Sequence, residues 1–154
     1  MITTSTTLGH IAFVDDDDEG PMELYREALG RVGFKLRDIR KVSEVFDYFR
    51  KNELNPVPDL WIIDIMMPIG EQDLDDAGFP LYQRTSYGLS SGLVVCERVR
   101  AAFPDVPILI LTSITTPDIL ENLPVDEKTQ ILSKIQVLPS ELATLSRAII
   151  NPRA

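Results

Sequence analysis

Short, uninterrupted apolar runs alternate along this chain with segments in which apolar residues recur at helical spacing. The runs cover residues 11–14, 60–63, 108–111 and 130–132, and a weaker strand is expected over roughly residues 34–42. Runs without polar alternation are typical of parallel strands that are covered on both faces. The pattern therefore predicts a doubly wound α/β domain, in which right-handed crossovers place helices on both faces of the sheet.

Four segments between and after these runs have the apolar period of a helix. Pro21 suits the first turn of the first helix, Ser43 is placed to cap the second, Pro104 ends the third, and the last follows Pro139. The side chains expected to face the core are Met22, Tyr25, Leu29 and Val32, then Val45, Phe46 and Phe49, then Val95, Cys96, Val99 and Phe103, and finally Leu142, Leu145 and Ile149.

Length and charge limit the classes of protein that remain. The 154 residues suggest one domain, expected over residues 10–151 after a flexible tail of residues 1–9. The net charge of -9 argues against binding to nucleic acid or to an anionic membrane. The first residues do not resemble a signal peptide, and no apolar segment is long enough to span a bilayer. Cys96 is the single cysteine and is expected in the core, and His10 is expected at the surface before the first strand. We expect a cytoplasmic protein.

Polar side chains stand where the apolar runs end. Asp15 and Asp16 follow the first run, Asp64 ends the third strand, Thr112 ends the fourth, and Lys134 comes just after the fifth. In open α/β sheets, ligands bind outside the carboxyl ends of the strands. We therefore expect three carboxylates, a hydroxyl and an ammonium group to meet on one rim of the sheet.

That set of groups suits phosphoryl transfer assisted by a metal ion. Mg²⁺ prefers oxygen ligands and commonly uses one or two carboxylates together with phosphate oxygens. Clustered carboxylates repel one another unless a cation lies among them. A carboxylate can then act as the nucleophile toward a phosphoryl group, whose oxygens Lys134 and Thr112 could bind.

At these places the sequence resembles the receiver domains of bacterial two-component response regulators. The segments that carry the resemblance are "FVDDDDE", "PDLWIIDIMMP" (residues 58–68), "VPILILTS" and "ILSK", and the resemblance extends over roughly residues 11–150. It implies a flavodoxin-like (CheY-like) fold with five parallel strands in the order 2-1-3-4-5. It also implies a receiver that stands alone and that signals by protein contact or in a phosphorelay, as a monomer or weak homodimer.

The resemblance also implies a role for each residue of the rim. Asp64 would accept a phosphoryl group from the phosphohistidine of a histidine kinase or a phosphotransfer protein, and a downstream protein would then respond. Mg²⁺ would be bound by Asp64, by Asp16 directly, by Asp15 directly or through water, and by the main-chain carbonyl of Met66. Thr112 and Lys134 would bind the phosphoryl oxygens. A slip of one residue would make Asp16 and Asp17 the ligands in place of Asp15 and Asp16.

The chain departs from the usual receiver pattern at several points. An insertion covers about residues 69–90, where we expect either an ordered cover or partner surface, or a mobile excursion. Ile131 stands where many receivers have an aromatic residue that takes part in switching, and Ile135 where many have a proline after the lysine. Pro124 limits the helix expected after the fourth strand to a short one.

Two other functions compete with the phospho-accepting receiver. Ile131 and Ile135 favour an interaction module that has the receiver fold but does not depend on phosphorylation. The third reading is a Mg²⁺-dependent phosphatase with an aspartyl intermediate. Phosphatases of the haloacid dehalogenase type have a second aspartate two residues after the nucleophile. Here Met66 occupies that position, which argues against this enzyme class.

Overall fold

The computed structural model describes residues 7–16, 20–70, 72–84, 91–113 and 126–151. Within these ranges, five parallel strands form one sheet in the order β2-β1-β3-β4-β5. The strands are β1 (Gly9–Val14), β2 (Phe34–Ile39), β3 (Leu60–Asp64), β4 (Ile108–Thr112) and β5 (Thr129–Ser133). The predicted flavodoxin-like fold and its strand order are therefore confirmed.

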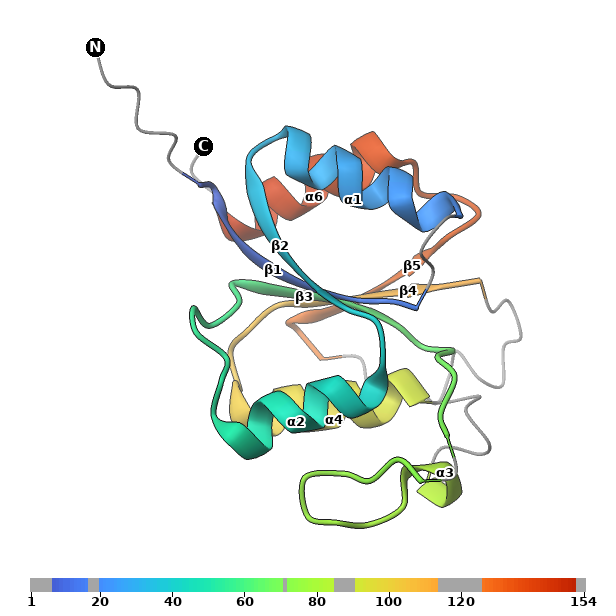
Figure 1. Ribbon diagram of the computed structural model, residues 1–154. Helices are drawn as coiled ribbons and strands as arrows, with labels where there is room; N and C mark the ends of the chain where they lie inside the picture. The colour runs from blue at the N-terminus through green and yellow to red at the C-terminus, as the bar shows by residue number, and fades with distance from the viewer. Residues whose placement is uncertain (1–6, 17–19, 71, 85–90, 114–125, 152–154) are drawn as a thin grey trace.

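Helices cover both faces of this sheet. Helices α1 (Pro21–Arg31) and α6 (Pro139–Ile150) lie on one face, and α2 (Val42–Lys51) and α4 (Ser91–Ala102) lie on the other (Figure 1). The short helix α3 (Leu81–Arg84) belongs to the segment between β3 and α4 and lies beyond the α2–α4 layer. The domain is thus a three-layer sandwich with the sheet in the middle.

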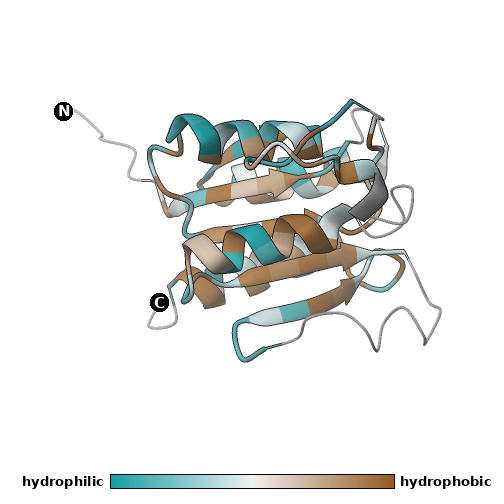
Figure 2. Ribbon diagram, turned by 90° about the horizontal axis from the view of Figure 1, so that it is seen from below, coloured by the Kyte–Doolittle hydropathy of each residue, from teal (hydrophilic) through white to brown (hydrophobic). Residues whose placement is uncertain are grey.

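The central strands β1, β3 and β4 are buried from both sides, which explains their continuous apolar composition. In β1, Phe13 packs in the core beneath α1 and α6, whereas Val14 packs in the core beneath α2 and α4. In β3, Ile62 and Trp61 divide in the same way, and Trp61 stacks on Phe49 with ring centroids 6.2 Å apart. Figure 2 shows brown, hydrophobic strand segments in the middle of the sheet and more mixed colouring on the helices. Two-sided burial leaves no position on a central strand for a polar alternation.

The end of one strand and the start of one helix differ from the sequence predictions. Strand β2 ends at Ile39, and α2 already begins at Val42, so the strand predicted to reach residue 42 was too long. A helix that starts there places Val42 and Phe46 together on its buried face. Lys41 is the N-cap residue and makes no side-chain cap hydrogen bond, so the prediction that Ser43 caps this helix was wrong. Ser43 lies in the first turn instead.

Most of the predicted apolar stripes do face the core. Val32 is the exception, because it is the C-cap residue of α1 and is exposed. Gly33 follows with a φ of 114°, which turns the chain toward β2 and leaves Val32 outside the layer. His10 lies within β1 and is half-buried, so the prediction that it precedes the strand was wrong. Cys96 is buried as expected, and burial raises the pKa of its thiol to about 12.

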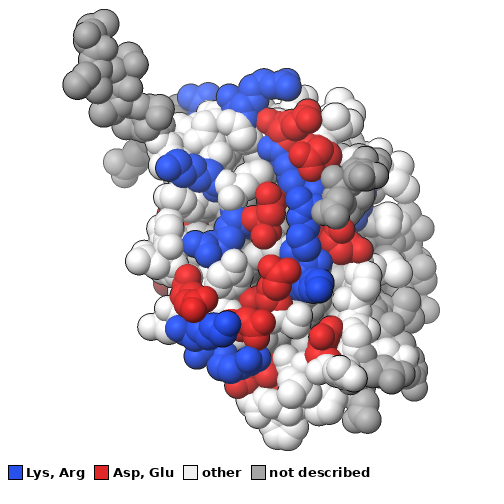
Figure 3. All heavy atoms as spheres, viewed as in Figure 1, with Lys and Arg blue, Asp and Glu red and all other residues white. Residues whose placement is uncertain are grey.

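Charged side chains of both signs are interleaved on the face seen in Figure 3. Ion pairs among the described residues include Arg50 with Asp47 at 3.0 Å and Arg98 with Asp76 at 2.9 Å. The net charge of -9 is therefore not gathered into a single acidic area on this face. Among the helices that the structure describes, none is long and apolar enough to cross a membrane.

Candidate functional site

The polar residues predicted from the strand ends lie on one rim of the sheet. Asp15 follows β1, Asp64 is the last residue of β3, and Thr112 is the last residue of β4. Asp64 is in register with Leu111, so Thr112 extends one position beyond it on the neighbouring strand. The main-chain N–H of Lys134 donates to the Thr112 carbonyl at 2.9 Å, which places the residue after β5 against the end of β4.

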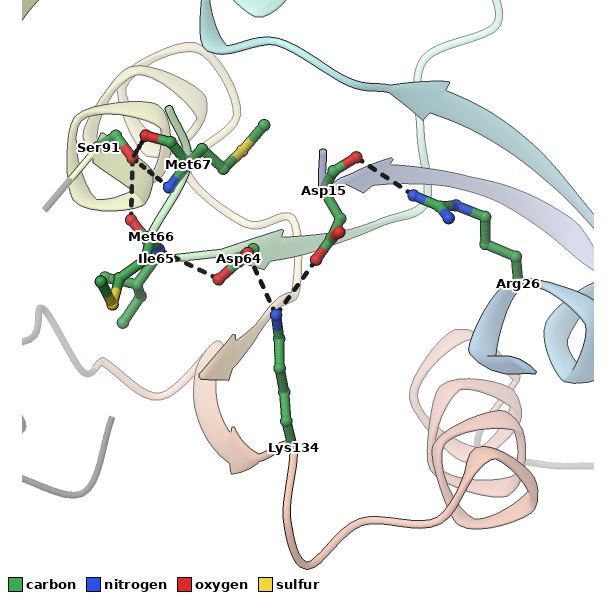
Figure 4. Close-up of polar contacts among 8 residues, drawn as sticks. All are labelled: Asp15, Arg26, Asp64, Ile65, Met66, Met67, Ser91 and Lys134. Atoms are coloured by element: carbon green, nitrogen blue, oxygen red, sulfur yellow. Dashed lines mark hydrogen bonds and ion pairs between the residues drawn. The ribbon is translucent and has the colours of Figure 1, made fainter. Parts of the chain in front are cut away.

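The side chain of Lys134 lies between two of the carboxylates. Its Nζ is 3.2 Å from Oδ2 of Asp64 and 3.4 Å from Oδ2 of Asp15 (Figure 4). Both carboxylates are buried, with exposed fractions of 6% for Asp64 and 1% for Asp15. One ammonium group, carried by the loop after the edge strand β5, therefore links two carboxylates that are 49 residues apart in the sequence.

Burial strongly affects the ionisation of this cluster. Loss of hydration raises the pKa of Asp64 to about 6, and the charge of Asp15 adds to this, although Lys134 acts in the opposite direction. Burial alone would lower the pKa of Lys134, but the charges of Asp64 and Asp15 outweigh it and raise that pKa above its ordinary value. The cluster thus has an excess of buried negative charge that one lysine does not neutralise.

Three of these acids also have the geometry of a cation site. Carboxylate oxygens of Asp15, Asp16 and Asp64 lie within 4.8 Å of one another, and no other group of this kind occurs in the described ranges. Asp16 is exposed, whereas the other two are buried. An all-oxygen set with uncompensated charge fits a hard divalent cation such as Mg²⁺. The alternative ligand Asp17 lies outside the described residues.

A buried arginine that was not singled out from the sequence supports the first acid. Arg26 on α1 is 5% exposed, and its Nη2 donates to the main-chain carbonyl of Asp15 at 3.2 Å. Its Nε donates to Asp38 of β2 at 3.0 Å, so the guanidinium joins the ends of two strands. Arg26 lies within the helical stripe that contains Met22 and Leu29. The sequence signal that could have identified Arg26 was a positively charged residue on a helical stripe that faces the core.

Asp64 is held from the other side by the chain that follows it. The main-chain N–H of Met66 donates to Asp64 Oδ1 at 3.1 Å. This bond orients one carboxylate oxygen and leaves the other to face Lys134 (Figure 4). The side chain of Met66 is exposed, beside the rim.

Ser91, at the start of α4, fastens the chain after β3 and also was not singled out from the sequence. Its hydroxyl accepts from the N–H of Met67 at 2.7 Å and lies within 3.0 Å of the carbonyls of Ile65 and Met67. The N–H of Gly92 donates to the Ile65 carbonyl at 2.7 Å. The insertion therefore leaves and re-enters the fold at a single buried junction next to Asp64.

Ser91→Ala is expected to lower the free energy of unfolding by about 2 kcal/mol, because the buried N–H of Met67 loses its acceptor. Urea unfolding followed by circular dichroism measures this change. Ser140→Ala, at an exposed position on α6, is a matched control that should change stability by less than about 0.5 kcal/mol. Equal stability of the two variants would show that the junction is not held by the serine.

The described part of the insertion is folded against α4. Leu81 is fully buried in the core beneath α2 and α4, and Asp76 pairs with Arg98 of α4 at 2.9 Å. Asp75 is also buried, and its Oδ1 accepts from the N–H groups of Ala77 and Phe79 at 2.9 Å each. For residues 72–84 these contacts favour the ordered cover or partner surface over the mobile excursion.

A hollow of about 670 Å³ lies between the rim and the start of the insertion. Asp16 from the rim, Lys41 from the start of α2, and Ile69 and Asp73 from the insertion are among the residues that line it. The exposed acid of the cluster is therefore reached from this side of the molecule.

Two departures from the receiver pattern have a clear place in the structure. Ile131 is half-buried and packs against the core beneath α2 and α4. Ile135 is 75% exposed, and its N–H donates to the Ser133 hydroxyl at 3.2 Å, a bond that a proline could not make. Pro124 lies outside the described residues, so the prediction of a short helix there stays a prediction.

Many solved structures share this fold, and response regulator receivers are frequent among them. A putative response regulator from Chloroflexus aurantiacus is 23% identical, with 92% of this chain and 97% of that chain covered and a TM-score of 0.62. A chemotaxis response regulator of Vibrio cholerae is 19% identical, with 93% and 99% covered and a TM-score of 0.63. A receiver protein from Sinorhizobium medicae is 17% identical, with 94% and 96% covered and a TM-score of 0.65.

Comparison by sequence adds nothing to this, because no family model and no curated protein matches the chain. At these identities the structural likeness establishes the CheY-like fold over more than nine-tenths of the chain. The resemblance read from the sequence motifs is thereby confirmed for the fold. The chemistry of the rim is argued from its own geometry.

Proposed function

We propose that this chain is a response regulator receiver domain that accepts a phosphoryl group on Asp64 from the phosphohistidine of a histidine kinase or a phosphotransfer protein. One observation carries the proposal. The ammonium of Lys134 lies 3.2 Å from the buried Asp64 carboxylate and 3.4 Å from Asp15, at the carboxyl edge of a CheY-like sheet. Protein contact, or transfer of the phosphoryl group to another protein, would then carry the signal onward.

The transfer follows from the positions of the side chains. A carboxylate oxygen of Asp64 forms a bond to phosphorus while the bond from phosphorus to the imidazole nitrogen breaks, and the electron pair stays on that nitrogen. Negative charge on the three phosphoryl oxygens requires donors around it. Lys134 supplies an ammonium group, and Thr112, which ends the next strand, supplies a hydroxyl.

The proposal includes Mg²⁺ held by Asp15, Asp16 and Asp64, with the main-chain carbonyl of Met66 as a further ligand. The three carboxylates lie within 4.8 Å of one another, which supports this set. When bound, the ion would offset the charge of the carboxylates and of the phosphoryl oxygens. Arg26 donates to the main-chain carbonyl of Asp15, and the N–H of Met66 donates to the carboxylate of Asp64, and these contacts support the same set.

The test is phosphorylation with a small donor. Mixed with Mg²⁺ and acetyl phosphate, the protein is expected to gain one phosphoryl group, detected as an increase in intact mass. Asp64→Asn should abolish the increase, whereas Asp105→Asn, at an exposed position away from the rim, should keep it. No increase in the native protein with acetyl phosphate, nor with a histidine kinase as donor, would contradict the proposal.

A second candidate is an interaction module that works without phosphate. The observation that favours it is the pair of isoleucines, because Ile131 packs against the core and Ile135 faces solvent where many receivers have switching and loop-fixing residues. The buried set of Asp15, Asp64 and Lys134 favours the receiver instead. The same phosphorylation experiment separates the two.

A further inference from the structure

The loop that presents Lys134 is held by a side chain from α1. Tyr25 is 4% exposed, and its hydroxyl lies between the carbonyl oxygens of Lys134, at 3.3 Å, and Val137. These two carbonyls begin and end one turn of the loop between β5 and α6. Burial raises the pKa of Tyr25, so the hydroxyl keeps its proton and acts as the donor in this contact.

The rest of this turn depends on Ser133. Its main-chain carbonyl accepts from the N–H groups of Gln136 and Val137, at 3.1 and 3.0 Å, and its hydroxyl accepts from Ile135. These bonds close the turn on the β5 side only. A side chain from a different element, Tyr25 of α1, also hydrogen-bonds to the main chain of this turn.

Tyr25 and its neighbour Arg26 therefore act on the two halves of the rim. Arg26 donates to the main-chain carbonyl of Asp15, a residue of the cation site. The single O–H of Tyr25 is shared between the carbonyls of Val137 and Lys134, at the two ends of the turn that carries the ammonium. Both residues lie on one turn of α1, and α1 packs directly on α6. One helix therefore contacts the main chain on both sides of the ion pair between Asp15 and Lys134.

We infer that Tyr25 is a positioning residue for Lys134, and that its hydroxyl fixes the loop at the place where this chain has Ile135 and not proline. The predicted effect of Tyr25 on the rate of phosphoryl transfer rests on the proposed function. Its predicted effect on the conformation of the loop does not depend on that function. The contacts that the structure shows for the Tyr25 hydroxyl are to the main chain of the loop and not to the carboxylates of Asp15 or Asp64, so Tyr25 acts through that main chain.

The test compares Tyr25→Phe with Tyr48→Phe, which removes a hydroxyl from a half-buried tyrosine on α2. With acetyl phosphate, Tyr25→Phe is expected to slow phosphorylation at saturating Mg²⁺ by about tenfold, because small displacements of a charge-stabilising group cost rate. The Mg²⁺ concentration for half-maximal rate should stay within about twofold, because Lys134 is not a metal ligand. Tyr48→Phe should match the native protein in both.

A double variant tests whether the effect passes through Lys134. In a Lys134→Ala background, Tyr25→Phe is expected to cause no further loss of rate, because the group that it positions is absent. An equal loss in both backgrounds would overturn the inference. So would a shift in the Mg²⁺ midpoint that accounts for the whole effect of Tyr25→Phe.

Hydrogen exchange gives a result that does not depend on phosphorylation. Amide exchange at Ile135, Gln136 and Val137 should become at least about tenfold faster in Tyr25→Phe and stay unchanged in Tyr48→Phe. Unchanged exchange in Tyr25→Phe would overturn the inference even if the native protein is phosphorylated. Conversely, faster exchange in a protein that never takes up phosphate would support the role in the loop and contradict the proposed function.

Discussion

Replacing Asp64 with asparagine is expected to stabilise the metal-free protein at pH 7 by on the order of 3 kcal/mol, while it removes the proposed phosphoryl acceptor. Burial raises the pKa of Asp64 to about 6, against 3.8 for the free side chain. Between these two values the folded protein binds more protons than the unfolded chain. Its stability therefore falls as the pH rises from about 4 to about 6, and asparagine abolishes that loss.

Urea unfolding at a series of pH values measures this effect. The native protein and Asp64→Asn should have similar stability near pH 4 and should differ most above pH 6. Asp105→Asn is the control and should follow the native curve, because its side chain lies in solvent. Added Mg²⁺ should narrow the difference, since it stabilises the charged carboxylates. If the free energy of unfolding of the native protein rose between pH 4 and pH 6 relative to that of Asp64→Asn, the raised pKa of Asp64 would be contradicted.

Among substitutions of the described glycines by alanine, Gly92→Ala is expected to destabilise the protein most. A Cβ there would lie 2.2 Å from the carbonyl oxygen of Asp64 and 2.5 Å from the Cα of Ile65. Both are backbone atoms, so α4 would have to move away from β3. We expect a loss of about 3 kcal/mol or more in the free energy of unfolding.

Gly30→Ala is the matched control for that substitution. Gly30 lies within α1, and a Cβ there meets no atom within 4 Å. The same chemical change should stabilise the protein by about 0.5–1 kcal/mol, because alanine favours a helix. Thermal or urea unfolding of the two variants checks the opposite signs. A small effect of Gly92→Ala would mean that the junction between Asp64 and α4 tolerates displacement, contrary to the packing described above.

The sheet and the rim were predictable from the sequence because their signals are local. A strand buried on both faces requires a continuous apolar run, and residues 60–63 have one. Parallel strands bring their carboxyl ends to one edge, so Asp15, Asp64 and Lys134 had to meet if the order 2-1-3-4-5 was right. The positions of these residues at the ends of the apolar runs were enough to predict that they share one rim.

Other features depend on contacts between distant segments and were missed. Ser43 has the chemistry of a helix cap, but Val42 is buried as the first residue of α2, so Lys41 occupies the N-cap position without a side-chain cap hydrogen bond. Ser91 and Gly92 resemble an ordinary loop end in the sequence. Only the approach of α4 to the end of β3 makes one a buried hydrogen-bond partner and the other a position without room for a side chain.

The sequence by itself thus determined the fold class and the group of residues on the rim, because hydrophobic period and strand direction are properties of the chain. The strand order was implied by the resemblance of its motifs to receiver domains. Only the tertiary structure decided how that group is held. Tyr25 and Arg26 on α1 bind the carbonyls of Lys134 and Asp15, and no local pattern encodes a hydrogen bond to a main-chain atom 109 residues away. Such contacts arise from packing of whole elements, which brings distant backbone groups within reach of one buried side chain.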